Sequence, residues 1–253
     1  MSKFIIGCFL FGLYSSFAFV PSIHEIELEK LFVIQDGFDS NDDIEVTLHM
    51  KLPNACYKVH NATIEKINTR TFNVKAYAKK KELSGCELGF YNTPVNVTQT
   101  LSIGELATGE YHFQYSSIKG DSIKIMRVKT ANGQTIDDTV YAPISNAFIP
   151  ELIYPTNNAQ VVLTGVFHNS CMRLNRRNIK IIRENNIFII IPKTEILDQE
   201  RCINELSPIR QIISLGPIKE AGSYLIHVRS MSGLSVNKTF YVNKTPEFNR
   251  GNL

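Results

Sequence analysis

The sequence predicts an all-β protein of two tandem antiparallel β-sandwich domains, each closed by one internal disulfide. Runs in which apolar and polar residues alternate occur in both halves of the 253-residue chain, and a period of two is typical of half-buried strands. The second half repeats the apolar pattern of the first, and four cysteines form two pairs of nearly equal spacing. We expect domain 1 over residues 19–143 and domain 2 over residues 144–253.

The first residues have the pattern of a secretory signal peptide. A short basic start precedes the uncharged run Phe4–Phe17, and Ser16 and Ala18 supply the small residues that signal peptidase requires. We expect residues 1–18 to be the signal peptide, with Cys8 removed in it. A membrane anchor is the alternative, for which the run is short. The sequence therefore predicts a secreted, periplasmic or cell-surface protein whose mature chain has no transmembrane segment.

Four cysteines remain after that cleavage, and an even number in an exported chain argues for disulfides. Cys56 and Cys86 are 30 positions apart, and Cys171 and Cys202 are 31 apart. Because the repeat places one pair in each half, we expect bonds within each domain. Zinc is the alternative, but no pair has the short spacing of a metal knuckle. We expect no cofactor.

In domain 1, the clearest strand is Ile44–Leu52, where five apolar residues alternate with four polar ones. A short strand is expected before it, between Ile23 and Ile34. Ala62–Ile67 and Phe72–Ala78 flank a polar turn and predict a hairpin. Asn92–Thr100 is a further strand candidate.

Two segments distinguish the halves. Between residues 120 and 138, domain 1 has about a dozen residues that domain 2 lacks. We interpret Ile123–Val128 and the turn Ala131–Gly133 as an extra hairpin before Thr139–Tyr141, which would match Thr239–Tyr241. The alternative is a long loop without a function of its own. In domain 2, Ile187–Ile191 is apolar on both faces. We expect this strand either to be buried on both sides or to place one face against domain 1 or a partner.

The most specific local pattern is a glycine and a tyrosine before an alternating strand, Gly109 and Tyr111 in domain 1 and Gly222 and Tyr224 in domain 2. It resembles the tyrosine corner of immunoglobulin-like sandwiches, where the hydroxyl binds the backbone a few residues upstream. Phe113 stands where antibody domains have their second cysteine, and the chain has no tryptophan. The chain thus resembles bacterial extracytoplasmic immunoglobulin-like or fibronectin-type domains, which implies a role in adhesion, envelope assembly or binding.

Four aspartates, Asp36, Asp39, Asp42 and Asp43, fall within eight residues. Their oxygens are of the kind that Ca²⁺ prefers. The spacing matches no EF-hand loop and lacks its distal glutamate. A solvated acidic turn is the favoured interpretation.

The densest cluster of positive charge lies in the more basic second half. It consists of Arg173, Arg176, Arg177, Lys180 and Arg183. Such a patch binds anionic polymers or acidic partners through electrostatics. No aromatic residues interleave with it as stacking platforms, so we expect no nucleic acid. An ordinary solvated strand is the alternative.

The six histidines show no metal-binding spacing, and His49, His112 and His227 lie at polar positions of strands, where we expect them to face solvent. No phosphate-binding loop or nucleophile elbow is present. The sequence therefore predicts a protein that is not an enzyme.

Asn61, Asn96, Asn237 and Asn243 each begin an Asn-X-Ser/Thr triplet. These are glycan acceptors in a eukaryotic secretory pathway and stay bare in a bacterium.

We expect a non-enzymatic extracytoplasmic binding or structural protein whose partner is a protein or an envelope polysaccharide. A periplasmic chaperone that captures exported subunits is one alternative. It would need a basic cleft between the domains and an exposed edge strand, for which Ile187–Ile191 is the candidate. A hydrolase with an unrecognised site is another.

Overall fold

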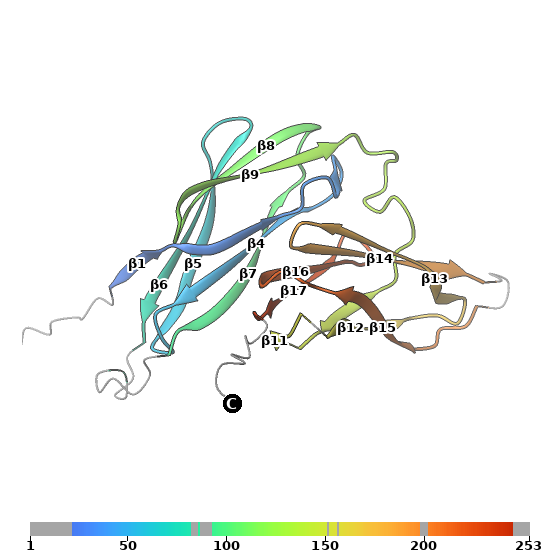
Figure 1. Cartoon of the computed structure of the whole chain (residues 1–253). Coiled ribbons are helices and arrows are strands. Elements are labelled where there is room, and N and C mark those ends of the chain that lie inside the picture. The colour runs from blue at the N-terminus through green and yellow to red at the C-terminus, as the bar shows by residue number, and fades with distance from the viewer. Residues whose placement is uncertain are drawn as a thin grey trace, which may run out of the picture.

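The fold class is confirmed by a computed structural model, which describes residues 22–81, 86, 93–150, 152–155, 157–197 and 202–244. Every named element in these residues is a β-strand. Figure 1 shows two bodies, formed by β1–β9 and by β10–β17. The expected signal peptide, residues 1–18, lies outside the described residues.

The strands follow the chain in two series. Domain 1 contains β1 (Ile23–Ile26), β2 (Leu28–Val33), β3 (Phe38–Asp39), β4 (Ile44–Leu52), β5 (Tyr57–Lys66), β6 (Thr71–Lys80), β7 (Val95–Gly104), β8 (Gly109–Ser117) and β9 (Gly120–Lys129). Domain 2 contains β10 (Ile144–Phe148), β11 (Leu152–Ile153), β12 (Asn158–Phe167), β13 (Met172–Glu184), β14 (Ile187–Ile196), β15 (Ser207–Pro217), β16 (Gly222–Arg229) and β17 (Ser235–Val242).

The strands of the two domains pair in the same way. β4 lies between β2 and β7, as β12 lies between β10 and β15. On the opposite sheets, β5, β6, β8, β9 and β3 follow one another as β13, β14, β16, β17 and β11 do. Most pairs of the described strands are antiparallel, but five are parallel. These are β6–β8 and β14–β16, the short pairs β3–β9 and β11–β17, and the single-residue contact of β2 with β8. Alternation of apolar and polar residues gives strand faces but not direction, so the sequence did not predict these parallel pairs.

Both predicted disulfides are present. The Cα atoms of Cys56 and Cys86 are 5.6 Å apart, and those of Cys171 and Cys202 are 5.3 Å apart. The turn before the first cysteine is built alike in the two domains. The Asn54 side-chain oxygen accepts the Cys56 N–H at 2.9 Å, and the Asn169 oxygen accepts the Cys171 N–H at 3.1 Å.

The predicted extra hairpin in domain 1 is wrong. β9 pairs with β8 along its whole length, as β17 pairs with β16, so residues 120–129 are the counterpart of residues 235–242. The two segments Thr139–Tyr141 and Thr239–Tyr241 both begin with threonine and end in tyrosine, and this short similarity led to the wrong alignment of the domains. Tyr141 instead bridges Lys193 in β14, and so belongs to the connection into domain 2.

β14 is buried on both faces because domain 1 covers one of them. Phe188 and Ile190 belong to the core of domain 2. Ile187 and Ile189 pack into a cluster with the core of domain 1, together with Leu225 from β16. The strand is therefore buried on both sides, as one interpretation expected, and one of its faces packs against domain 1, as the other expected.

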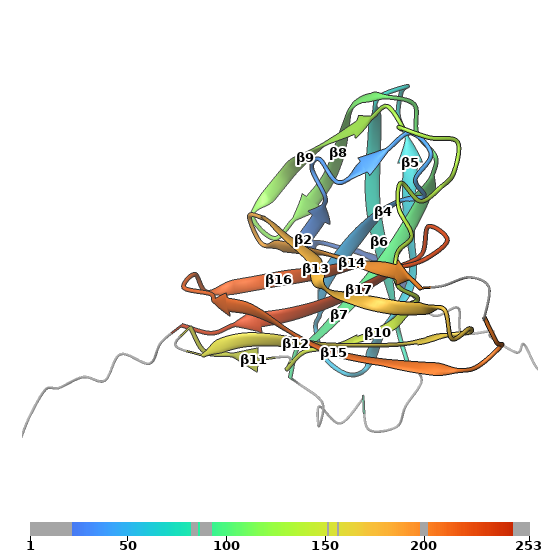
Figure 2. The same ribbon diagram turned by 90° about the vertical axis from the view of Figure 1, so that its right-hand side faces the viewer.

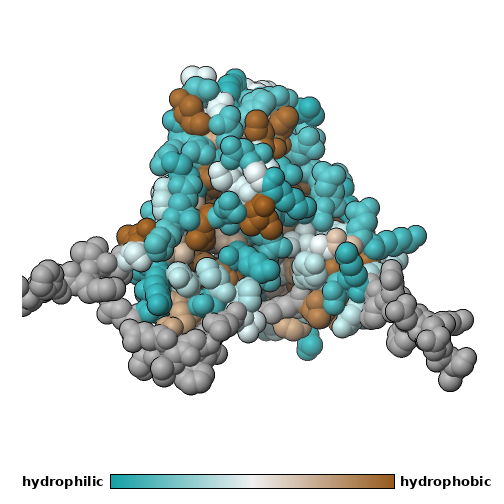
Figure 3. Space-filling view, turned by 60° about the vertical axis from the view of Figure 1, so that its left-hand side comes forward, coloured by the Kyte–Doolittle hydropathy of each residue, from teal (hydrophilic) through white to brown (hydrophobic). Residues whose placement is uncertain are grey.

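The domains meet sheet against sheet. Figure 2 shows the strands of domain 1 running steeply across those of domain 2. Thr47 and His49, on the outer face of β4, are buried, as is His227 of β16. The prediction that His49 and His227 face solvent is therefore wrong, because a second sheet covers the polar side of each strand. The surface seen in Figure 3 is mainly hydrophilic, with separate hydrophobic groups.

Candidate functional site

The candidate site is a groove at the open side of domain 2, between the edge strands β13 and β15. β13 departs from β14 between Leu174 and Ile179, which pair with Thr194 and Pro192. Residues 175–178 therefore bulge outward. Bulges of this kind re-aim side chains at sheet edges, and this one turns the side chains of β13 toward β15.

Arginines dominate the wall of this groove, which has a volume of about 750 Å³. Arg173, Arg176 and Arg177 come from β13, and Arg210 comes from β15. The Arg173 Nε atom donates to Glu195 Oε2 at 3.0 Å. This hydrogen bond lowers the pKa of Glu195, so the carboxylate stays ionised and neutralises one of the four guanidinium groups.

The structure divides the predicted cation cluster. Three of its members line the groove, whereas Lys180 and Arg183 do not. The guanidinium carbon of Arg183 lies 5.3 Å from the centroid of the Phe188 ring and 6.0 Å from that of Tyr224. Arg183 therefore has a structural cation–π role. Arg210 was missed because nothing local in the sequence places it beside β13.

The groove can bind negative charge. Guanidinium groups pair in a bidentate manner with carboxylate, sulfate and phosphate, and lose less entropy per bond than lysine does. Leu174, Pro208 and Ile209 add apolar surface between the charges. A ligand with more than one anionic group suits this arrangement.

Both corner tyrosines hold the backbone upstream of their own strand. The Tyr111 hydroxyl donates to the Ala107 carbonyl oxygen at 2.7 Å, and that of Tyr224 donates to the Glu220 carbonyl oxygen at 2.8 Å. This contact defines a tyrosine corner. The glycine two residues earlier has a φ of 146° at Gly109, a value that disfavours any side chain.

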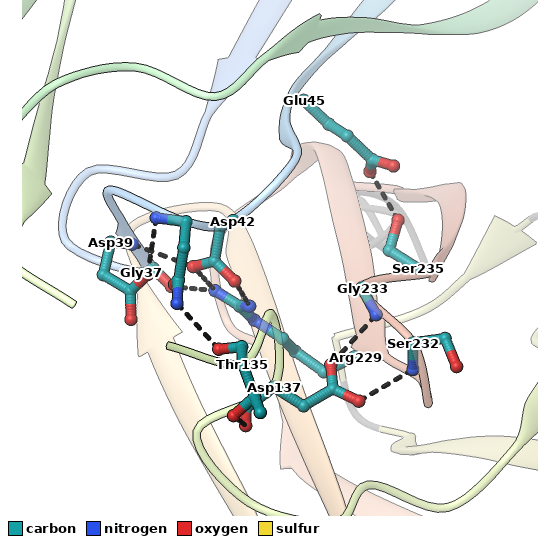
Figure 4. Close-up of polar contacts among 11 residues, drawn as sticks. Gly37, Asp39, Asp42, Glu45, Thr135, Asp137, Arg229, Ser232, Gly233 and Ser235 are labelled. Atoms are coloured by element: carbon teal, nitrogen blue, oxygen red, sulfur yellow. Dashed lines mark hydrogen bonds and ion pairs between the residues drawn. The ribbon is translucent and has the colours of Figure 1, made fainter. Parts of the chain in front are cut away.

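The acidic turn of domain 1 is an interdomain contact, and the prediction that it is solvated is wrong for Asp39 and Asp42, which are buried. Figure 4 shows the Arg229 guanidinium directed at Asp42. Its Nη1 and Nη2 atoms donate to the two carboxylate oxygens at 2.5 and 2.9 Å, and Nη2 also donates to the Gly37 carbonyl oxygen. A guanidinium thus occupies both Asp42 oxygens.

The other two candidate calcium ligands lie apart from that contact. Asp43 Oδ1 accepts hydrogen bonds from the Ser102 hydroxyl at 2.6 Å and from the Gly104 N–H at 3.2 Å. The main-chain carbonyl oxygen of Asp36 accepts a hydrogen bond from the Lys129 ammonium at 2.9 Å. Within the described ranges, no three His, Cys, Asp or Glu side chains are grouped to hold a metal ion.

Two more carboxylates join the domains (Figure 4). Asp137 accepts the backbone N–H groups of Ser232 and Gly233 at 2.7 and 2.9 Å. Glu45 accepts a hydrogen bond from the Asn237 amide at 2.8 Å and another from the Ser235 hydroxyl. With the packed face of β14, these contacts fix the orientation of one domain on the other.

Burial and the positive charge of Arg229 together lower the pKa of His227 to about 4. Its Nδ1 atom lies 2.9 Å from the Asn237 side-chain oxygen, and its ring meets the edge of Phe38. Burial also lowers the pKa of His49, against the opposing charge of Glu29. Both rings are therefore neutral parts of the interface at pH 7.

One arrangement has the residue types of a hydrolytic triad. His49 Nε2 is 3.4 Å from Glu29 Oε2, and its Nδ1 is 3.4 Å from the Thr98 hydroxyl. Nucleophile and base approach more closely in such sites, at about 2.6–3.2 Å. The Thr98 hydroxyl instead lies 2.6 Å from that of Thr239 across the interface. These contacts favour a structural role.

Two of the four glycan-acceptor triplets lie on open strands. Asn61 and Asn96 are exposed, whereas the Asn237 amide is engaged with Glu45. Asn243 is half-buried at the end of β17.

In the residues that the structure describes, no helix has the length and apolar character needed to cross a bilayer. Comparisons of the chain with protein families, with curated proteins and with solved structures found no match.

Proposed function

We propose that this chain is a non-enzymatic extracytoplasmic binding protein, in which a rigid pair of immunoglobulin-like domains presents a cationic groove to an acidic partner. The partner is a protein with clustered carboxylates or a carboxylated envelope polysaccharide. The observation that supports this best is the groove itself, where four arginines from two strands converge and one glutamate opposes them.

Other features support a location outside the cytoplasm, an origin by duplication and free access to the groove. Two disulfides are compatible with an oxidising compartment outside the cytoplasm. The strands pair in a corresponding order in the two domains, and in each domain an asparagine side chain accepts the N–H of the first cysteine. Both observations support an origin of the two domains by duplication. The interface leaves the groove at the far side of domain 2, so that domain 1 and a ligand do not compete for it.

Binding of a fluorescein-labelled oligogalacturonate, followed by fluorescence anisotropy at several salt concentrations, tests the proposal. The double variant Arg176→Gln/Arg210→Gln should weaken binding at least about tenfold and flatten its salt dependence. Lys180→Gln removes a cation from the same strand outside the groove and should leave binding within about twofold. Equal losses in both variants, or no binding by the wild type at low salt, would refute the proposal.

For the chaperone alternative, the edge strand expected at Ile187–Ile191 is not available. Ile187–Ile191 lies between β13 and β16 and is covered by domain 1, so it offers no free edge to a subunit. For the hydrolase alternative, the candidate set is the half-buried Glu29, the buried His49 and the exposed Thr98. The contacts that His49 makes with the other two are both 3.4 Å long, which disfavours it.

A further inference from the structure

A second groove lies where the two domains meet, on the opposite side from the arginines. Its volume is about 490 Å³, within the range of about 300–1,000 Å³ for ligand sites. Residues of β2 and β9 form its walls, and the β13–β14 turn, with Asn185 and Asn186, closes it from domain 2. The site therefore exists only when both domains are in place.

β9 presents an unpaired edge to this groove. Arg127 directs its N–H outward to the Gln35 carbonyl oxygen at 2.7 Å. Alternate residues of a strand direct their main-chain groups to the same edge, so Ile123 and Ile125 also point theirs outward. β3 pairs with β9 only at Val128 and Lys129, and no residue in the described ranges pairs with Ile123 or Ile125 on that edge.

The slot between β2 and β9 is closed at both ends. At one end the Ile118 N–H donates to the Leu28 carbonyl oxygen at 3.3 Å, and at the other Arg127 is bonded to Gln35. A strand that continued in both directions would have to break one of these bonds. The end of a chain can enter from the solvent side and pair with the free edge between them.

The chemistry of the walls matches a carboxylate on an apolar chain. Lys30 and Lys124 both line the groove. The Lys30 ammonium donates to the Ser223 carbonyl oxygen at 3.2 Å and lies over the Phe32 ring. Burial and the nearby charge of Lys124 together lower the pKa of Lys30 to about 8, an effect that an incoming anion would oppose.

The remaining groups in the groove suit the same ligand. Glu184 is the one carboxylate among the lining residues, and its Oε2 atom accepts the Gln35 N–H at 2.8 Å, so the two lysines leave the groove with a net positive charge. The side chains of Ile123 and Ile125 are 57% and 37% exposed and flank the free edge. Apolar side chains of a pairing strand would cover them.

We propose that this groove binds the C-terminal end of an extended partner polypeptide, whose last residues pair with the edge of β9 and whose terminal carboxylate meets Lys30 and Lys124. Main-chain hydrogen bonds supply affinity, and the lysines select a chain end over an internal segment. This site is independent of the arginine groove.

The probe is an array of fluorescein-labelled heptapeptides whose last three positions vary among Val, Ile, Phe, Thr and Ser, each made as the free acid and as the C-terminal amide. Anisotropy with the disulfide-bonded full chain should find free acids with a Kd below about 100 μM and amides at least about tenfold weaker. Equal binding of acid and amide, or no binding by any free acid, overturns the proposal.

Variants separate the contribution of the lysine contact from that of main-chain pairing with β9. Lys124→Gln should weaken the free acids about fivefold or more and leave the amides unchanged. Ile123→Pro removes one edge N–H but no bond to β8, and should abolish binding, whereas Ile123→Thr keeps the N–H and should retain it. The Arg176→Gln/Arg210→Gln protein should bind these peptides like the wild type. If this double variant loses binding, the peptides occupy the arginine groove. The proposal for the groove between β2 and β9 is then wrong, and the proposed function of the arginine groove is not affected.

Discussion

The guanidinium of Arg229 in β16 donates two hydrogen bonds to the carboxylate of Asp42, which lies 187 residues earlier in the chain. Both side chains are nearly buried, and the Phe38 ring lies 5.1 Å from the guanidinium carbon. Burial opposes the charge of Arg229, but the hydrogen bonds and charge of Asp42 outweigh it, so its pKa is raised. This pair is the central polar contact of the interface.

Asp42→Asn should lower the free energy of unfolding by about 3–5 kcal/mol, because it leaves the Arg229 charge buried without its counter-ion. Urea denaturation followed by tyrosine fluorescence measures the change. Arg127→Ala, which removes the exposed pair with Glu110, is the matched control and should cost less than about 1 kcal/mol. Equal costs for the two variants would contradict the role assigned to Asp42.

Stability should fall in mild acid because of His227. An unfolded histidine titrates near 6.5, whereas the pKa of His227 in the folded chain is about 4. Between these values the unfolded state binds a proton that the native state excludes, so stability is lost as pH falls through this window. At pH 5 the loss from this residue is about 2 kcal/mol relative to pH 7.5.

Urea denaturation at both pH values tests this, with His227→Gln expected to remove most of the loss. Some loss remains, because the pKa of His49 is lowered in the same direction. His112→Gln, at a half-buried position beside Glu110, should retain the full acid sensitivity. An unchanged pH dependence in His227→Gln would show that other groups cause it.

Tyr224→Phe should reduce stability by about 1 kcal/mol, because the Glu220 carbonyl oxygen loses its donor. Tyr111→Phe should act similarly through Ala107. Thermal unfolding measures both, and Tyr241→Phe, on an exposed ring, should change stability by less than about 0.5 kcal/mol. A neutral result at both corners would mean that the hydroxyl groups contribute nothing there.

Removing either disulfide should destabilise its own domain. The double variant Cys171→Ala/Cys202→Ala opens a loop of 31 positions in domain 2 and should lower the free energy of unfolding by about 2–5 kcal/mol. Native-state hydrogen exchange should then show larger losses of protection in β12–β17 than in β4–β9. Uniform losses over the chain would indicate that the two domains unfold only together.

Much of the fold followed from local patterns. Alternation predicted β4, and the hairpin over residues 62–78 appears as β5 and β6. The repeated cysteine spacing predicted both disulfides. The prediction failed where a match was short, as at Thr139–Tyr141, because three residues cannot distinguish a strand from a linker.

The sequence by itself determined the all-β fold class, the apolar face of strands such as β4 and how the cysteines pair, because each depends on a spacing along the chain. The tertiary structure decided which surfaces meet. From the sequence alone, Asp42 is predicted to be exposed, whereas in the structure it is buried in an ion pair with Arg229. Arg210 and Arg176 line the same groove because β13 and β15 are neighbouring edge strands. Contacts between sheets depend on strand order, direction and the crossing of the sheets, and a period of two residues encodes none of these.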